Sequence, residues 1–145
     1  MKILFVCTGN ICRSPMAEVI FKNLCIKNGR KSITVHGAGT YAEVGRPMME
    51  NAAKALRHCG ERLTRQQKSA KQIGQKMLDD YNWIICMTQE HKTFIGEYAH
   101  VKTLHDFTGC GDVLDPWGYS IETYVAVCKQ LQIHLATLYD EVCKI

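Results

Sequence analysis

Residues 2–24 read KILFVCTGNICRSPMAEVIFKNL, and this stretch decides the fold. Residues 2–7 form a nearly continuous apolar run, which is typical of a buried parallel strand. Polar residues then interrupt the run. Ser14-Pro15 predicts a helix start, with Ser14 as N-cap and Pro15 as the first helical residue, and apolar side chains keep helical spacing up to Gly29. The stretch therefore predicts a strand, a loop and a helix.

The rest of the chain continues this alternation. Apolar runs predict strands over 32–38, 83–87 and 101–104. Helical spacing and capping patterns predict helices over 47–60, after a capping box of Ser69 and Gln72, after Thr88, and over 120–142, with a polar loop over 105–119. Strands that alternate with helices form parallel βαβ units. No linker or internal repeat divides the chain, so we expect one α/β domain over residues 1–145.

Composition and charge exclude several classes of protein. Hydrophobic residues make up 46% of the chain and charged residues 22%, which is typical of a globular domain. The apolar runs are too short to cross a membrane, so we expect no membrane partner. Residues 1–76 contain fourteen Lys or Arg against four Asp or Glu, whereas residues 77–145 contain four against ten. The basic half indicates an anionic partner or a solvated basic surface; without interleaved aromatic side chains, it does not indicate nucleic acid.

The chain has eight cysteines, whose spacing indicates whether it binds zinc and whose number raises the question of whether it works in a reducing or an oxidising compartment. No C-x2-C pair occurs, so the usual basis of a zinc site is missing and we expect no metal. The strand pattern begins at the first residues, without an apolar signal segment. We therefore expect a cytoplasmic protein with reduced thiols.

The loop from Cys7 to Ser14 carries the candidate chemistry. It leads from the carboxyl end of a predicted strand into a helix N-terminus, where unpaired amides and the helix dipole favour an anion such as phosphate. Gly9 permits a positive φ or a close backbone approach, and Asn10 tolerates a left-handed conformation. Arg13 offers a planar pair of donors to phosphate. We expect Cys7 to be a nucleophilic thiolate with Ser14 as a donor to it, although a buried core cysteine is the alternative.

Asp115-Pro116-Trp117 supplies the second group that this chemistry needs. Attack of a thiolate on a phosphate ester needs a general acid for the leaving oxygen and later a base for water. Asp115 follows the fourth predicted strand, at the same sheet edge as Cys7, and Pro116 biases it toward an extended backbone. Asp112 is a competing carboxylate in the same loop. The ring of Trp117 offers a stacking surface for an aromatic substrate.

Residues 6–18, VCTGNICRSPMAE, and the Asp115-Pro116 pair resemble the phosphate loop and general-acid pair of the low-molecular-weight protein tyrosine phosphatases, and the similarity spans nearly the whole chain. The resemblance implies a flavodoxin-like three-layer α/β domain with a four-stranded parallel sheet, order 2-1-3-4, and about five helices. It implies hydrolysis of phosphotyrosine in proteins or peptides through a phosphocysteine, with inorganic phosphate as product and no metal or cofactor. The implied catalytic residues are Cys7, Arg13 and Asp115, and the implied substrate-binding residues are Thr8, Gly9, Asn10, Ile11, Cys12, Ser14, Tyr41 and Trp117.

Substrate choice within this family leaves an alternative. Residues 87–92 and 111–116 resemble the bacterial branch that includes protein-arginine phosphatases. In that branch a threonine at the position of Ile11 is associated with phosphoarginine selectivity. The apolar Ile11 offers no hydroxyl to a guanidinium, so phosphotyrosine is the preferred prediction. Tyr41 and Trp117 are implied as aromatic walls of the cleft, with simple packing as the alternative for Tyr41.

Two positions near Asn10 depart from the family pattern. Gly37 stands where many relatives have serine, and Lys68 stands where a histidine occurs; in relatives those groups help to hold the loop asparagine. We therefore expect water or another donor to orient Asn10. We expect His36 to be a structural residue rather than a replacement.

Cys12 indicates redox chemistry in the loop, and the Cys-x5-Arg pattern is compatible with three other functions. Oxidation is expected to join Cys12 to Cys7 in a protective disulfide. An arsenate reductase shares the Cys-x5-Arg loop but needs relay cysteines, and Cys86 lies inside a predicted strand. A phosphocarrier would leave Arg13 and Asp115 without a role. A non-hydrolytic phosphoprotein-binding module would not need the full catalytic set.

Overall fold

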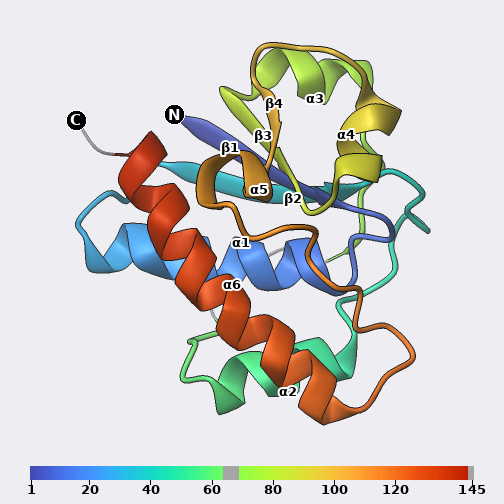
Figure 1. The fold of residues 1–145 in the computed structure, drawn as a ribbon, viewed down its shortest axis with the longest axis vertical. Coiled ribbons are helices and arrows are strands. Elements are labelled where there is room, and N and C mark those ends of the chain that lie inside the picture. Colours follow the sequence, from blue (N-terminus) through green and yellow to red (C-terminus); the bar gives the residue numbers. More distant parts are fainter. Residues whose placement is uncertain (64–68, 144–145) are drawn as a thin grey trace.

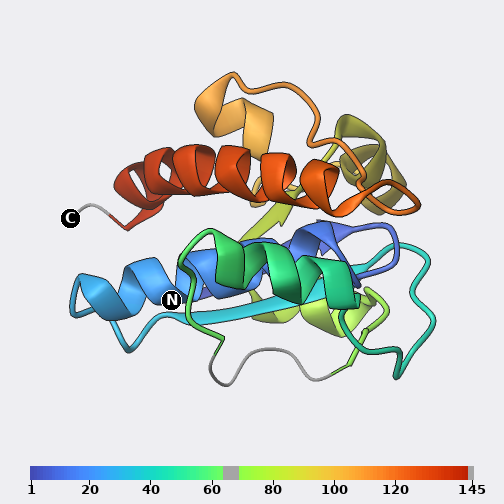
Figure 2. The ribbon, with the colours of Figure 1, turned by 90° about the horizontal axis from the view of Figure 1, so that it is seen from below.

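The computed structural model describes residues 1–63 and 69–143, which form a parallel sheet covered by helices on both faces (Figure 1, Figure 2). The four strands lie in the order β2-β1-β3-β4, which confirms the predicted topology. They are β1 (Lys2–Cys7), β2 (Thr34–Gly39), β3 (Trp83–Cys86) and β4 (Val101–Thr103). Because β1 lies between β2 and β3, its carboxyl end lies in the middle of one sheet edge.

The described residues contain six helices, against about five predicted. They are α1 (Arg13–Lys27), α2 (Glu50–His58), α3 (Gln75–Asp80), α4 (Gln89–Ile95), α5 (Leu104–Thr108) and α6 (Ile121–Val142). Figure 1 shows α3 and α4 on one side of the sheet and α1, α2 and α6 on the other. The prediction missed α5, which begins in a capping box of Thr103 and Asp106, because so short a helix has no readable periodicity.

Alternating strand side chains give the sheet two apolar faces. Phe5 of β1 packs in the larger core with Phe21 of α1 and with α6. Leu4 points to the smaller core, which Leu78 of α3 and Ile95 of α4 complete. Among the described residues, no helix combines the length and apolar character needed to cross a membrane.

Two helices begin at positions other than those predicted. Helix α1 starts at Arg13, and its N-cap residue is Cys12, whose side chain makes no capping hydrogen bond. The prediction of Ser14 as N-cap is wrong, because its hydroxyl bonds to groups of the preceding loop instead. Helix α2 starts at Glu50 rather than at Pro47.

The predicted helix start at Ser69 and Gln72 is also wrong. Gln72 pairs with Gly39 in a parallel bridge that extends the end of β2, and the next helix, α3, begins only after Gly74. Gly39 approaches the loop closely, since a Cβ atom there would lie 2.4 Å from the backbone oxygen of Thr8. The segment after residue 68 thus lies against the loop that follows β1.

Candidate active site

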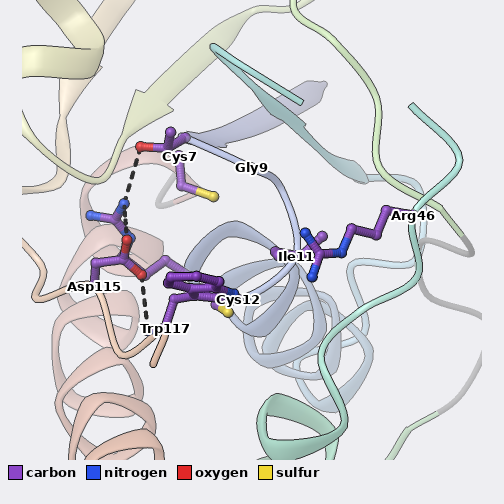
Figure 3. Close-up of a pocket in the computed structure, with 9 residues that line it drawn as sticks. Cys7, Gly9, Ile11, Cys12, Arg46, Asp115 and Trp117 are labelled. Carbon is purple, nitrogen blue, oxygen red and sulfur yellow. Dashed lines mark hydrogen bonds and ion pairs between the residues drawn. The ribbon is translucent and has the colours of Figure 1, made fainter. Parts of the chain in front are cut away.

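A pocket opens at the carboxyl edge of the sheet, where β1 leads into the loop before α1 (Figure 3). Cys7 is 2% exposed and lines it. Helix α1 begins directly after the loop, so its unpaired N–H groups adjoin the pocket. The pocket brings together most of the predicted site residues, and it adds Arg46, which the sequence analysis missed; its lining is Cys7, Thr8, Gly9, Ile11, Cys12, Arg13, Arg46, Asp115 and Trp117.

A directed series of hydrogen bonds ends on the sulfur of Cys7. The backbone N–H of Lys71 donates to Asn10 Oδ1 at 3.0 Å, which fixes the orientation of that amide. Asn10 Nδ2 donates to Ser14 Oγ at 2.7 Å, and Ser14 Oγ lies 2.9 Å from Cys7 Sγ. Because the Ser14 oxygen already accepts a bond, its own O–H is free to donate to the sulfur of Cys7.

The backbone of the loop enters the left-handed region at one of the two residues that could adopt it. Asn10 has a φ of 56°, the one positive value at a non-glycine residue in the described parts of the chain, as predicted. Gly9 is not in the left-handed region, so of the two possibilities that glycine allows there, the positive φ is not used. Ile11 is 8% exposed, and its carbonyl accepts a hydrogen bond of 2.9 Å from the N–H of Met49. The loop is therefore tied to the start of α2 as well as to α1.

Arg13 joins the loop to the segment that carries Asp115. One guanidinium nitrogen donates to the carbonyl of Val113 at 3.0 Å. The other donates to Thr8 Oγ1 at 3.3 Å and lies 3.6 Å from Asp115 Oδ2. Arg13 is 5% exposed, so these contacts hold a buried positive charge at the pocket.

The two carboxylates of the 105–119 loop have different surroundings. Asp115 has a side chain 51% exposed and lines the pocket, where the N–H of Trp117 donates to its Oδ1 at 3.2 Å. Asp112 instead accepts a hydrogen bond of 3.0 Å from the N–H of Gln89 at the start of α4. Of the two, Asp115 is the one that lines the pocket together with Cys7.

The aromatic and basic groups around the pocket differ from the prediction. Trp117 is 56% exposed and lines the pocket. Tyr41 is not part of that lining; its ring packs against Phe94 at a tilt of 59°, with centroids 5.1 Å apart. Figure 3 shows Arg46 on the side of the pocket opposite Asp115 and Trp117. Arg46 also forms an ion pair with Glu43, at 3.7 Å. Nothing in the sequence around Arg46 distinguishes it from the other basic residues of the first half.

Cys12 is buried beside Cys7 and bonds elsewhere. Its sulfur lies 3.4 Å from the hydroxyl of Tyr124 on α6, and burial raises the pKa of Cys12 to about 11. All eight cysteines are free thiols, so the disulfide between Cys7 and Cys12 stays a prediction. Within residues 1–63 and 69–143, no group of three or more His, Cys, Asp or Glu residues is placed to hold a metal ion.

His91 is a buried residue behind the loop that the sequence analysis did not identify. It is 4% exposed, and its Nε2 lies 2.8 Å from Thr8 Oγ1. Burial lowers the pKa of His91 to about 4, and the nearby positive charge of Arg13 acts in the same direction. The ring is therefore neutral at pH 7.

The structure shows which groups orient Asn10 in place of the serine and histidine found in relatives. The expected other donor is the backbone N–H of Lys71, together with the bond from Asn10 to Ser14. Lys68 lies outside the described residues. His36 bonds to the hydroxyl of Tyr81 at 2.6 Å, which fits the expected structural role.

Comparisons with known proteins agree with this geometry. Residues 2–144 match the family described as low molecular weight phosphotyrosine protein phosphatase. The chain is 35% identical to the protein-arginine-phosphatase of Bacillus subtilis (99% of this chain, 95% of the relative). It is 34% identical to the low molecular weight protein-tyrosine-phosphatase YfkJ of the same species (91% and 89%). The crystal structure of a low molecular weight protein tyrosine phosphatase from T. tengcongensis superposes with a TM-score of 0.89 at 32% identity (98% and 99%). The chain therefore belongs to the low molecular weight protein tyrosine phosphatase family and is an enzyme of that class.

Proposed function

We propose that this protein hydrolyses phosphotyrosine in proteins or peptides through a phosphocysteine on Cys7. One observation carries the proposal: the buried sulfur of Cys7, 2.9 Å from the Ser14 hydroxyl, lines the same pocket as Arg13 and Asp115. A nucleophile, an anion-binding group and a proton donor are thus gathered where a phosphate ester can enter.

In the first step the thiolate of Cys7 attacks phosphorus. A sulfur–phosphorus bond forms while the bond from phosphorus to the phenolic oxygen breaks. The loop N–H groups and Arg13 stabilise the charge on the remaining phosphate oxygens. Asp115 donates its proton to the leaving oxygen, which departs as neutral tyrosine.

In the second step water attacks the phosphocysteine. Asp115, now a carboxylate, takes a proton from the water as the new oxygen–phosphorus bond forms. The sulfur–phosphorus bond breaks and returns the thiolate, which the Ser14 hydroxyl stabilises as a hydrogen-bond donor. Inorganic phosphate leaves, so it is the product and, by the same contacts, a competitive inhibitor.

The pocket walls favour an aryl ester. Ile11 and the ring of Trp117 both line the pocket and offer apolar surface to the tyrosine ring. Tyr41 with Phe94 forms an exposed aromatic pair beside the loop, since the N–H of Tyr41 donates to the Thr8 carbonyl at 2.9 Å. We assign this pair to contacts with the polypeptide around the phosphotyrosine.

A second candidate function is dephosphorylation of phosphoarginine in proteins. The 35% identity to a protein-arginine-phosphatase favours it. The side chain of Ile11 argues against it, because a guanidinium placed there meets no hydrogen-bond acceptor from that residue.

One assay separates the two candidates. The kcat/KM values for a phosphotyrosine peptide and for the matching phosphoarginine peptide are measured with the wild type and with Ile11→Thr. We expect the wild type to prefer phosphotyrosine by at least about tenfold and Ile11→Thr to shift the ratio toward phosphoarginine. A wild type that prefers phosphoarginine contradicts the proposal.

The proposed reaction needs no metal or cofactor, because the chain itself supplies the nucleophile, the anion-binding groups and the proton donor. Activity should therefore be unchanged by EDTA. We also propose a reducing compartment, the cytoplasm, in which the free thiols of Cys7 and Cys12 persist.

A further inference from the structure

His91 lies behind the loop, and Thr88 fixes which of its ring nitrogens carries the proton. The backbone N–H of Thr88 donates to His91 Nδ1 at 3.2 Å. Thr88 Oγ1 accepts from the backbone N–H of His91 at 3.3 Å and lies 3.0 Å from the same Nδ1, so its own O–H is available to donate there too. A nitrogen that accepts carries no proton, so the neutral ring carries its proton on Nε2.

This tautomer determines what the hydroxyl of Thr8 can do. Nε2–H of His91 lies 2.8 Å from Thr8 Oγ1 and donates to it. Arg13 donates to the same oxygen at 3.3 Å. A hydroxyl oxygen has two acceptor sites, and both are then occupied. The O–H of Thr8 consequently points away from these two donors, toward the pocket that Thr8 lines.

We propose that His91 is a positioning residue that makes the Thr8 hydroxyl an obligate hydrogen-bond donor to phosphate in the pocket. The proposal rests on the proposed phosphatase function, since phosphate is the group to be bound. His91 is buried and is not part of the pocket lining, so it acts through Thr8 alone. A donor already oriented toward an anionic oxygen binds it more strongly than a hydroxyl that is free to rotate or to accept.

The charged groups around His91 keep this arrangement at neutral pH. Burial and Arg13 disfavour a charged ring, while Asp112 and Asp115 oppose them more weakly. A proton on Nδ1 would turn that nitrogen into a donor facing the N–H of Thr88. A neutral ring thus preserves the acceptor contact of Nδ1 with Thr88, which holds the ring in place while Nε2–H donates to Thr8.

Two variants separate this role from the capping of α4. In His91→Asn the amide oxygen takes the place of Nδ1 as acceptor for Thr88, but the side chain is too short to reach Thr8. In His91→Gln the amide nitrogen takes the place of Nε2 and restores the donor. Both replacements are uncharged, so they leave the local charge unchanged at pH 7.

The readout is the dissociation constant of inorganic phosphate, measured by titration calorimetry at pH 7, with the Tm of each variant as a check on folding. We expect His91→Asn to weaken phosphate binding about tenfold and His91→Gln to stay within about threefold of the wild type. In a Thr8→Val background, which lacks the hydroxyl, His91→Asn should cause no further loss. Equal losses in both backgrounds, or wild-type binding by His91→Asn, would overturn the proposal.

Phosphate binding does not require turnover, so this test is read separately from the proposed function. Phosphate binding with the expected pattern but no hydrolysis of a phosphotyrosine peptide would refute the proposed function and leave the role of His91 standing. Hydrolysis of the peptide, with equal phosphate dissociation constants for His91→Asn and His91→Gln, would refute the role of His91 and leave the proposed function standing.

Discussion

The floor and the rim of the pocket are built differently. The floor, which we define as Cys7, Asn10 and Ser14, is at most 2% exposed and is connected by hydrogen bonds of 2.7 to 2.9 Å. The rim, defined as Asp115, Trp117 and Arg46, is at the surface, with the side chain of Asp115 51% exposed and Trp117 56% exposed.

The floor is built to serve the chemical step, and the rim is built to select the substrate. A buried, fully bonded floor is pre-organised for one geometry, so changes there should act on kcat. Replacing an exposed rim side chain leaves the geometry of the floor intact. Such substitutions should therefore act mainly on KM for particular substrates. Asp115 is the exception, because it sits on the rim but is the proton donor of the proposed mechanism.

The largest effect should come from removing the nucleophile on the floor. Cys7→Ser should lower kcat for a phosphotyrosine peptide by about 10⁴-fold or more, because a serine hydroxyl is not ionised at neutral pH. Steady-state kinetics measures the loss, and an unchanged Tm controls for folding. Cys128→Ser, which alters a buried cysteine outside the pocket lining, is the matched control and should retain the wild-type kcat when folded.

The next effect tests the exception on the rim. Asp115→Asn should lower kcat for a phosphotyrosine peptide by about 10²- to 10³-fold, and much less for p-nitrophenyl phosphate, whose leaving group needs no proton. The matched control is Asp112→Asn, since that carboxylate bonds to the N–H of Gln89. Equal losses in the two variants, or equal losses on the two substrates, would show that Asp115 is not the acid.

Ser14→Ala tests whether the floor stabilises the leaving thiolate. Loss of a donor to a charged sulfur should slow breakdown of the phosphocysteine by about 10- to 100-fold. Stopped-flow assays with p-nitrophenyl phosphate should then show a burst of nitrophenol followed by a slow steady state. A reduced burst rate with an unchanged steady state would place the role of Ser14 in the attack instead.

The buried ring behind the floor should make stability depend on pH. The folded protein keeps His91 neutral down to about pH 4, whereas the unfolded ring takes a proton near 6.5. Unfolding therefore binds a proton between these values, and lowering the pH from 7 to 5 should cost about 2 kcal/mol of stability through this group. Urea unfolding of the wild type and His91→Gln measures it; an identical pH dependence in the two would contradict the expectation.

The smallest effect should come from the rim aromatic. Trp117→Ala should raise KM for a phosphotyrosine peptide by about three- to tenfold and leave the inhibition constant of inorganic phosphate unchanged, because phosphate has no ring to stack. Tyr119→Ala removes an equally exposed aromatic outside the pocket lining and should change neither value. A parallel loss of phosphate binding in Trp117→Ala would mean that rim and floor are not independent.

Local sequence predicted the floor because its parts are close along the chain. Cys7, Asn10 and Ser14 lie in one loop and the start of α1, and the alternation of strands and helices placed that loop at the sheet edge. Asp115 followed from the chemistry that a thiolate requires. The proline after it favoured Asp115 over Asp112, and Asp115 is the one of the two that lines the pocket.

The supports of the floor were not predictable in this way, because they come from distant segments. Position 39 needs a glycine because a Cβ atom there would collide with the backbone oxygen of Thr8. The donor to Asn10 is the main-chain N–H of Lys71, which any residue except proline could supply. Arg46 reaches the pocket from the segment before α2. The expected role of Tyr41 as a pocket wall did not match its position, because its ring packs on Phe94 instead.

The most direct test of the central claim is mass spectrometry of Asp115→Asn, quenched in acid during turnover of a phosphotyrosine peptide. The proposed mechanism predicts a phosphoryl group on the peptide that contains Cys7, present only while substrate remains and absent in the Cys7→Ala form of the same variant. Product formation with no phosphocysteine at any time point, or phosphate on another residue, would contradict it.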